Sequence, residues 1–216
     1  PRRFYGLTDR GPNADGGGNV KIFLQPSFTP SIGHFEIQRD GSIRKLRTIP
    51  LKNAQGKPVR LYSLLEKSNV VLTWYRGGWC PYCNLALKQL QDALPEIKAQ
   101  GALLVALTPE LPDSSLSTKE KHQLQFEVLS DLNNEVARTY GLVFKLDETT
   151  ATRYEQGFQL SAYNGNHSAE LPMPATYIID QKGIIRYAFV EADYKQRANP
   201  KVIVGELKKI GAKAKN

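Results

Sequence analysis

The apolar and polar pattern in the middle of the chain predicts a strand, a helix and a second strand. Val70–Trp74 is a mostly apolar run typical of a buried strand. After a glycine turn, apolar residues recur at helical spacing up to Ile97, and Gly101 is expected to end that helix. Pro95 should kink it. The next apolar run, Ala102–Leu107, predicts a strand, so the unit is expected to form a right-handed crossover between parallel strands.

The pattern predicts further elements on both sides of this unit. Ile49–Leu65 alternates apolar and polar residues around Asn53–Gly56, which predicts a hairpin and a short helical turn. Downstream the sequence predicts a helix at Ser117–Gln125 with Ser117 and Glu120 as its capping box, a strand at Phe126–Ser130, a helix from Asp131 to Tyr140, an antiparallel pair formed by Ala175–Asp180 and Ile184–Val190 around Gln181–Gly183, and an amphipathic helix at Pro200–Ile210.

The N-terminal part is less regular. Pro1–Gly18 is rich in arginine, glycine and asparagine and is expected to form an arm. Short strands are expected at Val20–Leu24 and Gly33–Ile37, and a turn at Arg39–Ser42 leads into Ile43–Ile49 as an N-terminal hairpin. We therefore expect two parts, an arm and hairpin over residues 1–48 and one domain over residues 49–216.

A second irregular segment, Leu142–Leu171, interrupts the pattern of strands and helices. It is interpreted as an insertion that is partly helical at Asp147–Gln159. Ser161–Ser168 is expected to form a loop, because asparagine, glycine and serine dominate it.

Composition narrows the class of protein. The 216 residues are 41% hydrophobic, which suffices for the core of one domain with an extension. The net charge is +8, but the basic residues are dispersed and not interleaved with aromatic ones, so no nucleic-acid partner is expected. No apolar run approaches the roughly 18 residues of a membrane helix, and no membrane association is expected. Because the chain begins at Pro1 rather than Met, an export signal could have been removed, and localisation stays open with the cytoplasm slightly favoured.

The only two cysteines, Cys80 and Cys83, form a C-x-x-C motif between the strand and the helix. Pro81 is expected at the first helical position, which makes Cys80 the N-cap. Unpaired backbone N–H groups and the positive end of the helix dipole would favour the Cys80 thiolate, and Arg76 adds a positive charge. Cys83 lies one turn further on, close enough to form a disulfide with Cys80.

The cysteine pair has two other interpretations, a pair of inert buried thiols or half of a zinc site. Zinc normally takes four ligands. The three histidines, His34, His122 and His167, show no ligand spacing with the motif. We therefore favour redox chemistry and expect neither a metal nor an organic cofactor.

The ordered set of motifs resembles the alkyl hydroperoxide reductase/thiol-specific antioxidant family of peroxiredoxins. The resemblance covers about Ile49–Ile210 and rests on G-x-P-V-x-L, W-C-P-Y-C, A-L-T-P-E, V-L-S-D and P-A-T-Y-I-I-D-x-x-G-I-I-R. It implies an α/β thioredoxin-like fold, with a central mixed sheet flanked by helices and an N-terminal hairpin extension. Within the family, Y-R-G-G-W-C-P-Y-C-N is similar to a branch that carries a thioredoxin-type C-x-x-C.

The active loop departs from the family pattern. That pattern has a proline seven residues and a threonine or serine three residues before the attacking cysteine. Counted from Cys80, these positions hold Thr73 and Gly77. The family's second arginine would fall near Pro174. If the protein is a peroxidase, Arg76 is therefore expected to carry more of the task of holding the substrate anion.

The comparison with thioredoxins suggests candidate residues for the proton relay and for the rim of the site. Their buried acid would correspond to Trp74, so Glu110 or a bound water is left to move protons. Two aromatic residues are expected to shape the rim, Trp79 and Tyr82. Arg197 is expected to pair with Asp193 rather than to fold back towards the site.

Pro174 stands where thioredoxins have a cis proline. By resemblance, the bond between Met173 and Pro174 is expected to be cis and to face the cysteines. The backbone before a cis proline can pair with an extended substrate, so both residues are expected to bind substrate.

The resemblance implies a thiol peroxidase. The Cys80 thiolate would attack a hydroperoxide, Cys83 would close a disulfide, and a thioredoxin-like or glutathione-linked donor would restore the dithiol. A homodimer is expected on resemblance alone. Two rival hypotheses remain, a protein-disulfide oxidoreductase of thioredoxin type and a non-catalytic redox-sensing module.

Overall fold

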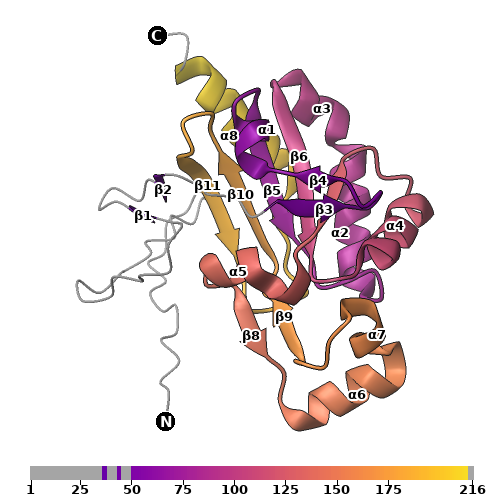
Figure 1. Cartoon of the computed structure of the whole chain (residues 1–216). Coiled ribbons are helices and arrows are strands. Elements are labelled where there is room, and N and C mark those ends of the chain that lie inside the picture. Colours follow the sequence, from indigo (N-terminus) through magenta and orange to yellow (C-terminus); the bar gives the residue numbers. More distant parts are fainter. Residues whose placement is uncertain (1–35, 38–42, 45–49, 214–216) are drawn as a thin grey trace. The chain divides into compact units, whose positions relative to one another are not determined.

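The computed structural model describes Glu36–Ile37, Ile43–Arg44 and residues 50–213 (Figure 1). Its centre is a mixed seven-stranded sheet in the order β11-β10-β5-β6-β7-β3-β4. These strands are β3 (Leu51–Asn53), β4 (Pro58–Val59), β5 (Asn69–Trp74), β6 (Ala102–Thr108), β7 (Glu127–Ser130), β10 (Ala175–Ile179) and β11 (Ile185–Val190). A separate antiparallel pair joins β8 (Val143–Lys145) to β9 (Glu170–Pro172).

The middle of the sheet is parallel. β5 pairs with β6 along its whole length, and β6 pairs with β7. Their apolar runs are buried on both faces, as expected of parallel strands, and Val70, Val71 and Leu72 are all 0% exposed. Because parallel strands end at the same edge, the loops that follow Trp74 and Thr108 lie side by side.

Antiparallel strands complete the sheet on both sides. β10 pairs with β5 and β11 with β10, whereas β3 pairs with β7 and β4 with β3. The two hairpins predicted around Asn53–Gly56 and Gln181–Gly183 are confirmed. Asp180 holds the second turn, because its Oδ1 accepts hydrogen bonds from the N–H groups of Lys182 and Ile184, both at 2.9 Å.

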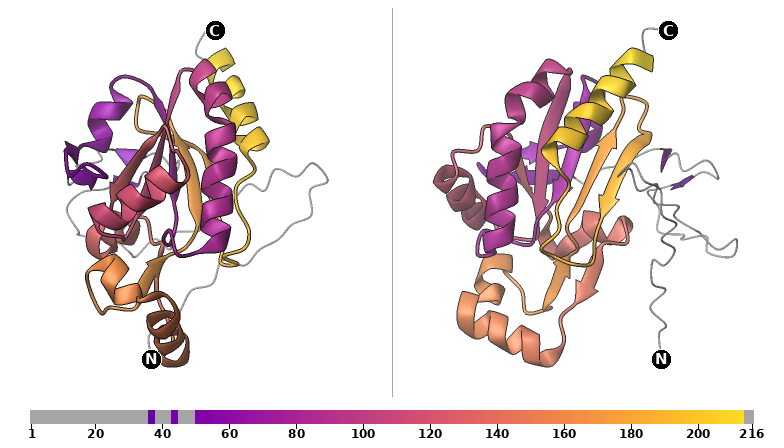
Figure 2. Two further views of the ribbon diagram at one scale, coloured as in Figure 1. Left: turned by 90° about the vertical axis from the view of Figure 1, so that its right-hand side faces the viewer. Right: turned by 180° about the vertical axis from the view of Figure 1, so that it is seen from behind.

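Helices cover both faces of the sheet (Figure 2). They are α1 (Leu61–Leu65), α2 (Pro81–Asp92), α3 (Leu94–Ala99), α4 (Pro112–Lys121), α5 (Glu135–Thr139), α6 (Glu148–Phe158), α7 (Leu160–Asn164) and α8 (Pro200–Lys213), with a 3-10 turn η1 (Leu132–Asn134). On one face α2 and α8 lie side by side and bury Leu87 and Leu207 against Val71. On the other, α1 and α5 bury Leu61 and Val136 against Leu72. The predicted α/β layering is confirmed.

The β5–α2–β6 unit follows the sequence closely. α2 begins at Pro81 with Cys80 as its N-cap, as predicted. The helical run breaks at Ala93, and α3 starts there with Pro95 in its first turn. Gly101 ends this run with φ +68°, a left-handed value that favours glycine. The position of Cys80 is thus fixed by local sequence.

The predicted helix at Ser117–Gln125 is wrong at both ends. α4 runs from Pro112 to Lys121, because Pro112 fits the first helical turn, where an N–H would have no partner. Ser117 is internal to the helix, and its hydroxyl donates to the carbonyl of Asp113 at 3.0 Å instead of capping.

The Leu142–Leu171 segment folds as β8, α6, α7 and β9. Asp147 caps α6 by accepting a backbone N–H of its first turn at 2.9 Å. The predicted loop at Ser161–Ser168 is wrong at its start, because α7 extends to Asn164. Gly165 then ends α7 with φ +67°.

The expectation of a cis Pro174 is wrong, because no peptide bond among the described residues is cis. Met173 and Pro174 connect β9 with β10. The Met173 N–H donates to the carbonyl of Leu142 at 2.8 Å, and the Pro174 carbonyl accepts the N–H of Glu191 at 3.4 Å. These bonds tie the segment to the β8–β9 pair and to the end of β11.

At the N-terminal side, β1 (Glu36–Ile37) and β2 (Ile43–Arg44) form an antiparallel pair around the predicted turn. The predicted arm at Pro1–Gly18 and strand at Val20–Leu24 lie outside the described residues. The division at residues 48 and 49 stays a prediction. Within the described part of the chain, no helix is both long and apolar enough to cross a membrane.

Candidate active site

The two cysteines lie at the junction of β5 and α2, in a segment that we call the thiol loop, residues 75–83. Both are free thiols and almost fully buried, Cys80 at 1% exposed and Cys83 at 0%. The first turn of α2 begins at Cys80, whose carbonyl accepts the N–H groups of Cys83 and Asn84 at 3.0 and 3.1 Å. Asn84 in turn donates to the Gly78 carbonyl at 2.8 Å, which fixes the loop against the helix.

Two close approaches explain the glycines of the thiol loop. A Cβ on Gly77 would lie 2.2 Å from Nε1 of Trp79, and one on Gly78 would lie 2.0 Å from Oγ1 of Thr118. The indole of Trp79 therefore occupies the space that a side chain at position 77 would need. This is the physical reason why a threonine does not fit there in the present conformation.

Arg76 holds the thiol of Cys80. The guanidinium is buried, at 3% exposed, and its Nη2 donates to Cys80 Sγ at 3.1 Å. Its Nη1 donates to the hydroxyl of Tyr154 at 3.3 Å. The ring of Tyr194 lies against the guanidinium with its centroid 4.1 Å from Cζ. A buried charge held in this way favours an anion at the sulfur.

The two thiols have opposite pKa shifts. The pKa of Cys80 is lowered to about 5, first by a hydrogen bond with Cys83 and then by the charge of Arg76 and its hydrogen bond, which outweigh desolvation. The pKa of Cys83 is raised well above its ordinary value, because of burial, its hydrogen bond with Cys80 and the charge of that thiolate. At neutral pH Cys80 is therefore the thiolate and Cys83 carries the proton.

Arg197 folds back to the thiols, against the expectation that it pairs with Asp193. Its Nη2 donates to Cys83 Sγ at 3.4 Å, and its Nη1 donates to the carbonyls of Tyr194 and Gln196. Asp193 instead accepts the N–H of Lys195 at 3.0 Å. The expected ion pair fails because the turn after β11 uses this carboxylate for its own backbone.

Glu110 lies beneath the thiol loop, at the end of β6. It is 0% exposed, and its Oε1 accepts the N–H of Gly78 at 2.9 Å while its Oε2 accepts the hydroxyl of Thr108 at 3.2 Å. Burial nevertheless raises the pKa of Glu110 to about 7. The pKa of the neighbouring Tyr75 is raised by burial first and then by the charges of Glu110 and Cys83. Tyr75 is thus close to both groups.

The predicted rim residues, Trp79 and Tyr82, are the partly exposed aromatic residues of the thiol loop. Trp79 is half-buried, whereas Tyr82 is 41% exposed and packs edge-on against Tyr194 with centroids 5.6 Å apart. Met173 packs instead with the apolar cluster on the opposite face of the sheet. Within residues 50–213, no hydrogen bond joins Met173 or Pro174 to the cysteines or to Arg76.

Sequence reasoning missed an aromatic cap, which we define as Tyr154, Phe158 and Tyr194. Phe158 stacks on Trp79 with centroids 5.2 Å apart, and Tyr154 meets the same indole edge-on at 5.3 Å. Tyr154 and Phe158 come from α6 and Tyr194 from the turn after β11. The i, i+4 spacing of Tyr154 and Phe158 was the one available signal, and it indicates a shared helix face without saying what that face covers.

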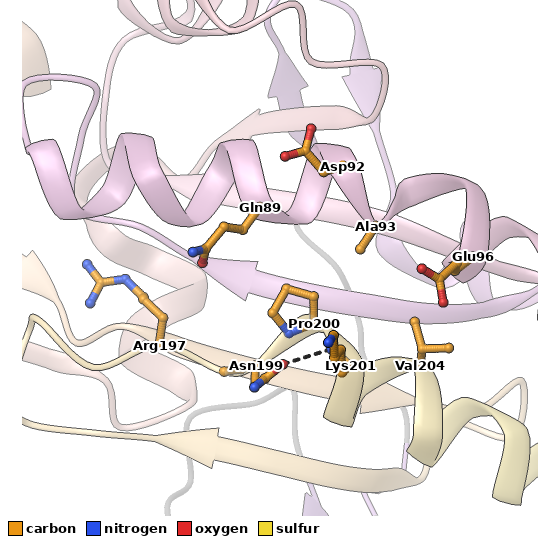
Figure 3. Close-up of a pocket in the computed structure, with 10 residues that line it drawn as sticks. Gln89, Asp92, Ala93, Glu96, Arg197, Asn199, Pro200, Lys201 and Val204 are labelled. Carbon is orange, nitrogen blue, oxygen red and sulfur yellow. Dashed lines mark hydrogen bonds between the residues drawn. The ribbon is translucent and has the colours of Figure 1, made fainter.

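A groove of about 480 Å³ lies between α2, α3 and the start of α8 (Figure 3). It is lined by Gln89, Asp92, Ala93, Glu96, Arg197, Ala198, Asn199, Pro200, Lys201 and Val204. Arg197 is the residue that connects this groove with Cys83. Among the described residues, no group of three or more His, Cys, Asp or Glu side chains could hold a metal ion.

Comparison with known proteins identifies what the chain is similar to. The sequence profile described as AhpC/TSA family matches residues 33–188. Peroxiredoxin Q, chloroplastic, of Triticum aestivum is 27% identical over 160 residues, which are 74% of this chain and 61% of the relative. The corresponding protein of Sedum lineare is 25% identical over 139 residues, 64% of this chain and 63% of the relative. The chain thus spans about three fifths of the length of these relatives.

Solved structures support the fold. Peroxidoxin BcpB from Mycobacterium tuberculosis superposes with a TM-score of 0.60 at 20% identity, over 75% of this chain and 92% of that one. Peroxiredoxin 6 of Arenicola marina gives a TM-score of 0.63 at 17% identity, over 77% of this chain and 71% of that one. The predicted thioredoxin-like fold with its mixed central sheet is confirmed.

Proposed function

The chain belongs to the AhpC/TSA family, and from this membership and the site geometry we propose that it is a thiol peroxidase. Its substrate is a hydroperoxide, and its reductant is a thiol donor of thioredoxin-like or glutathione-linked type. The catalytic residues are Cys80 and Cys83. The names of the relatives support the class of reaction, and the buried thiols support the roles of the two residues.

One observation carries the proposal. The guanidinium of Arg76 donates to Cys80 Sγ at 3.1 Å while both groups are nearly excluded from water. A thiolate is the attacking species in peroxide reduction, and its formation here does not require an added base because the pKa of Cys80 is about 5. The same guanidinium can orient the peroxide, since it carries a fixed charge beside the sulfur.

The first step oxidises Cys80. Its thiolate attacks the terminal oxygen of ROOH, the S–O bond forms, the O–O bond breaks and RO⁻ leaves. Glu110, with a pKa of about 7, is the proposed source of the proton that turns RO⁻ into ROH. Its bond to the Gly78 N–H supports this role, because that bond ties the carboxyl to the thiol loop.

The second step closes the disulfide. Cys83 attacks the sulfur of the Cys80 sulfenic acid, the S–S bond forms, and hydroxide leaves and is protonated by solvent. The proton of the Cys83 thiol returns to Glu110, and Tyr75 is the hydroxyl near both groups. Two electrons from the donor thiols then restore the dithiol.

The other residues predicted to bind substrate have different proposed roles. Trp79 and Tyr82 form the rim that a hydroperoxide or a reductant meets first. Met173 and Pro174 remain predicted contacts for an extended partner, although the cis bond on which that prediction depended is not present.

A second candidate is a protein-disulfide oxidoreductase without peroxidase activity. It is favoured by the C-x-x-C pair together with Gly77, where Trp79 leaves no room for the hydroxyl residue of the peroxiredoxin pattern. A redox-sensing module without catalysis is the third possibility.

The experiment that tests the proposal mixes reduced protein with hydrogen peroxide or cumene hydroperoxide and follows tryptophan fluorescence by stopped flow. We expect fast oxidation in the wild type, no reaction in Cys80→Ser, and a single phase that ends at sulfenic acid in Cys83→Ser. Oxidation of the wild type no faster than that of free cysteine would contradict a peroxidase. Rapid reduction of insulin disulfides would then support the second candidate, and inactivity in both assays the third.

A further inference from the structure

The turn between β11 and α8, residues 191–199, contacts both Cys83 and Arg76, the residue that holds Cys80. Its backbone is held by its own polar groups, because the Gln196 N–H donates to the Asp193 carbonyl at 2.9 Å and Asp193 Oδ1 accepts from Lys195. Tyr194 lies against the guanidinium of Arg76. Three residues later, Arg197 reaches Cys83. One short segment therefore supplies a group to each side of the pair.

In the reduced protein, hydrogen bonds already hold the side chain of Arg197 in position beside Cys83. Its Nη1 is occupied by the carbonyls of Tyr194 and Gln196, which leaves Nη2 directed to Cys83 Sγ at 3.4 Å. Figure 3 shows the guanidinium beside α2, on the chain that leads into α8. A guanidinium held by two carbonyls loses little further freedom when a charge forms beside it.

Cys83 needs such a partner. It is 0% exposed, and both burial and Cys80 raise its pKa, so it is a poor nucleophile by itself. The charge of Arg197 is the first cause that acts in the opposite direction. Arg76 cannot do this for Cys83 to the same degree, because its donors are directed to Cys80 and to Tyr154.

From this geometry we propose that Arg197 activates and positions Cys83 as the resolving nucleophile, so that each thiol of the pair has its own arginine. The inference rests on the proposed function, since it concerns the second step of that reaction. The Cys83 thiol passes its proton to Glu110, and Arg197 stabilises the negative charge that forms on the Cys83 sulfur. The electron pair of this sulfur then forms the S–S bond. The bond between Cys80 sulfur and its hydroxyl oxygen breaks, and hydroxide leaves.

The kinetic test compares Arg197→Gln, Arg197→Lys and wild type in the stopped-flow assay with hydrogen peroxide. We expect disulfide closure, the second fluorescence phase, to slow by about tenfold in Arg197→Gln, which corresponds to one pKa unit of lost thiolate at Cys83. Arg197→Lys should recover most of this rate because it keeps the charge. Lys201→Gln, in the same groove but without a bond to Cys83, is the matched control and should close at the wild-type rate.

A second readout separates this inference from the proposed function. In a Cys80→Ser background, the pH dependence of iodoacetamide alkylation reports the pKa of Cys83 without any peroxide. Arg197→Gln should shift this profile upwards by about one unit, and Arg197→Lys should not. A slow first phase in the wild type would refute the proposed peroxidase function but not the effect of Arg197 on Cys83. An unshifted alkylation profile, or a lysine variant as slow in closure as the glutamine variant, would overturn the role of Arg197.

Discussion

The thiol loop contains Cys80 and Arg76, and the aromatic cap packs on Arg76 and Trp79 of that loop, but the two regions are assembled from different parts of the sequence. In the thiol loop, the contacts of Cys80 come from residues close in sequence, with Arg76 four positions before it and Pro81 directly after it. In the cap, Tyr154 and Tyr194 come from α6 and from the turn after β11. Both then meet at Arg76.

The difference teaches which part of the chemistry depends on local structure. The thiol loop creates the nucleophile, because Cys83 and Arg76 are the causes that lower the pKa of Cys80. The cap places no charge near that sulfur. Its rings exclude water from Arg76 and hold the guanidinium, which strengthens an interaction that the loop already makes. Variants in the loop should therefore change the reaction itself, and variants in the cap should change its efficiency.

The largest effect is expected from Arg76→Gln, which removes the residue shared by both regions. The pKa of Cys80 should rise, and oxidation by hydrogen peroxide at pH 7 should slow on the order of 100-fold, because a charged hydrogen bond and part of the thiolate are lost together. In the wild type the rate should rise with pH through about 5 and then level off. In the variant this rise should move to higher pH, as measured by stopped flow between pH 4 and 9.

Arg186→Gln is the matched control for this prediction. Arg186 bonds the carboxylate of Asp180 at 2.6 Å on the edge hairpin and contacts neither cysteine. Its oxidation rate and pH profile should equal those of the wild type. If Arg76→Gln kept the wild-type profile, the thiol loop would not be the source of the reactive thiolate.

A smaller effect, on stability, is expected from Glu110→Gln, in addition to the loss of the proposed proton source. Burial raises the pKa of Glu110 from 4.5 to about 7, so the folded state binds its proton more tightly than the unfolded state does. This contribution to stability is complete below about pH 4.5 and is lost as the pH rises through 7. It amounts to as much as about 3 kcal/mol, from 1.36 kcal/mol per pKa unit.

Urea unfolding at pH 4.5, 6 and 8 measures this effect. Relative to the wild type, Glu110→Gln should become progressively more stable as the pH rises, because the amide has no charge to bury and can still accept the Gly78 N–H. Glu127→Gln, on β7 and half-buried, is the control and should show no such trend. A difference independent of pH would mean that folding does not change the pKa of Glu110, so that the carboxyl is ionised at neutral pH and cannot supply a proton there.

The same contrast explains what the sequence could predict. The strand, the glycine turn and the N-cap at Cys80 are decided within a few residues, and all three were predicted correctly. Pro95 was predicted to kink the helix, and it lies in the first turn of α3, just after the break at Ala93. Local reasoning failed where two local signals competed. Ser117 and Glu120 have the spacing of a capping box, but Pro112 starts the helix earlier, and the serine then bonds within it.

Contacts between distant segments could not be obtained in this way. Arg197 had a nearby carboxylate in sequence, Asp193, and pairing with it was the simpler expectation. The turn uses that carboxylate for its backbone, and the packing of β11 against β10 brings the guanidinium to Cys83 instead. The cis bond at Pro174 was carried over from thioredoxins, whereas here the segment is bonded to Leu142 and Glu191 in the trans form.

The smallest effect is expected from Tyr154→Phe, which tests the cap alone. The variant removes the hydroxyl that accepts Arg76 Nη1 at 3.3 Å but keeps the ring that packs on Trp79. One hydrogen bond of about 0.5–1.5 kcal/mol predicts that oxidation of Cys80 slows by about twofold to tenfold. Tyr163→Phe, in α7, is the control and should leave the rate unchanged. A loss as large as that of Arg76→Gln would mean that the cap, and not the thiol loop, determines the position of the guanidinium.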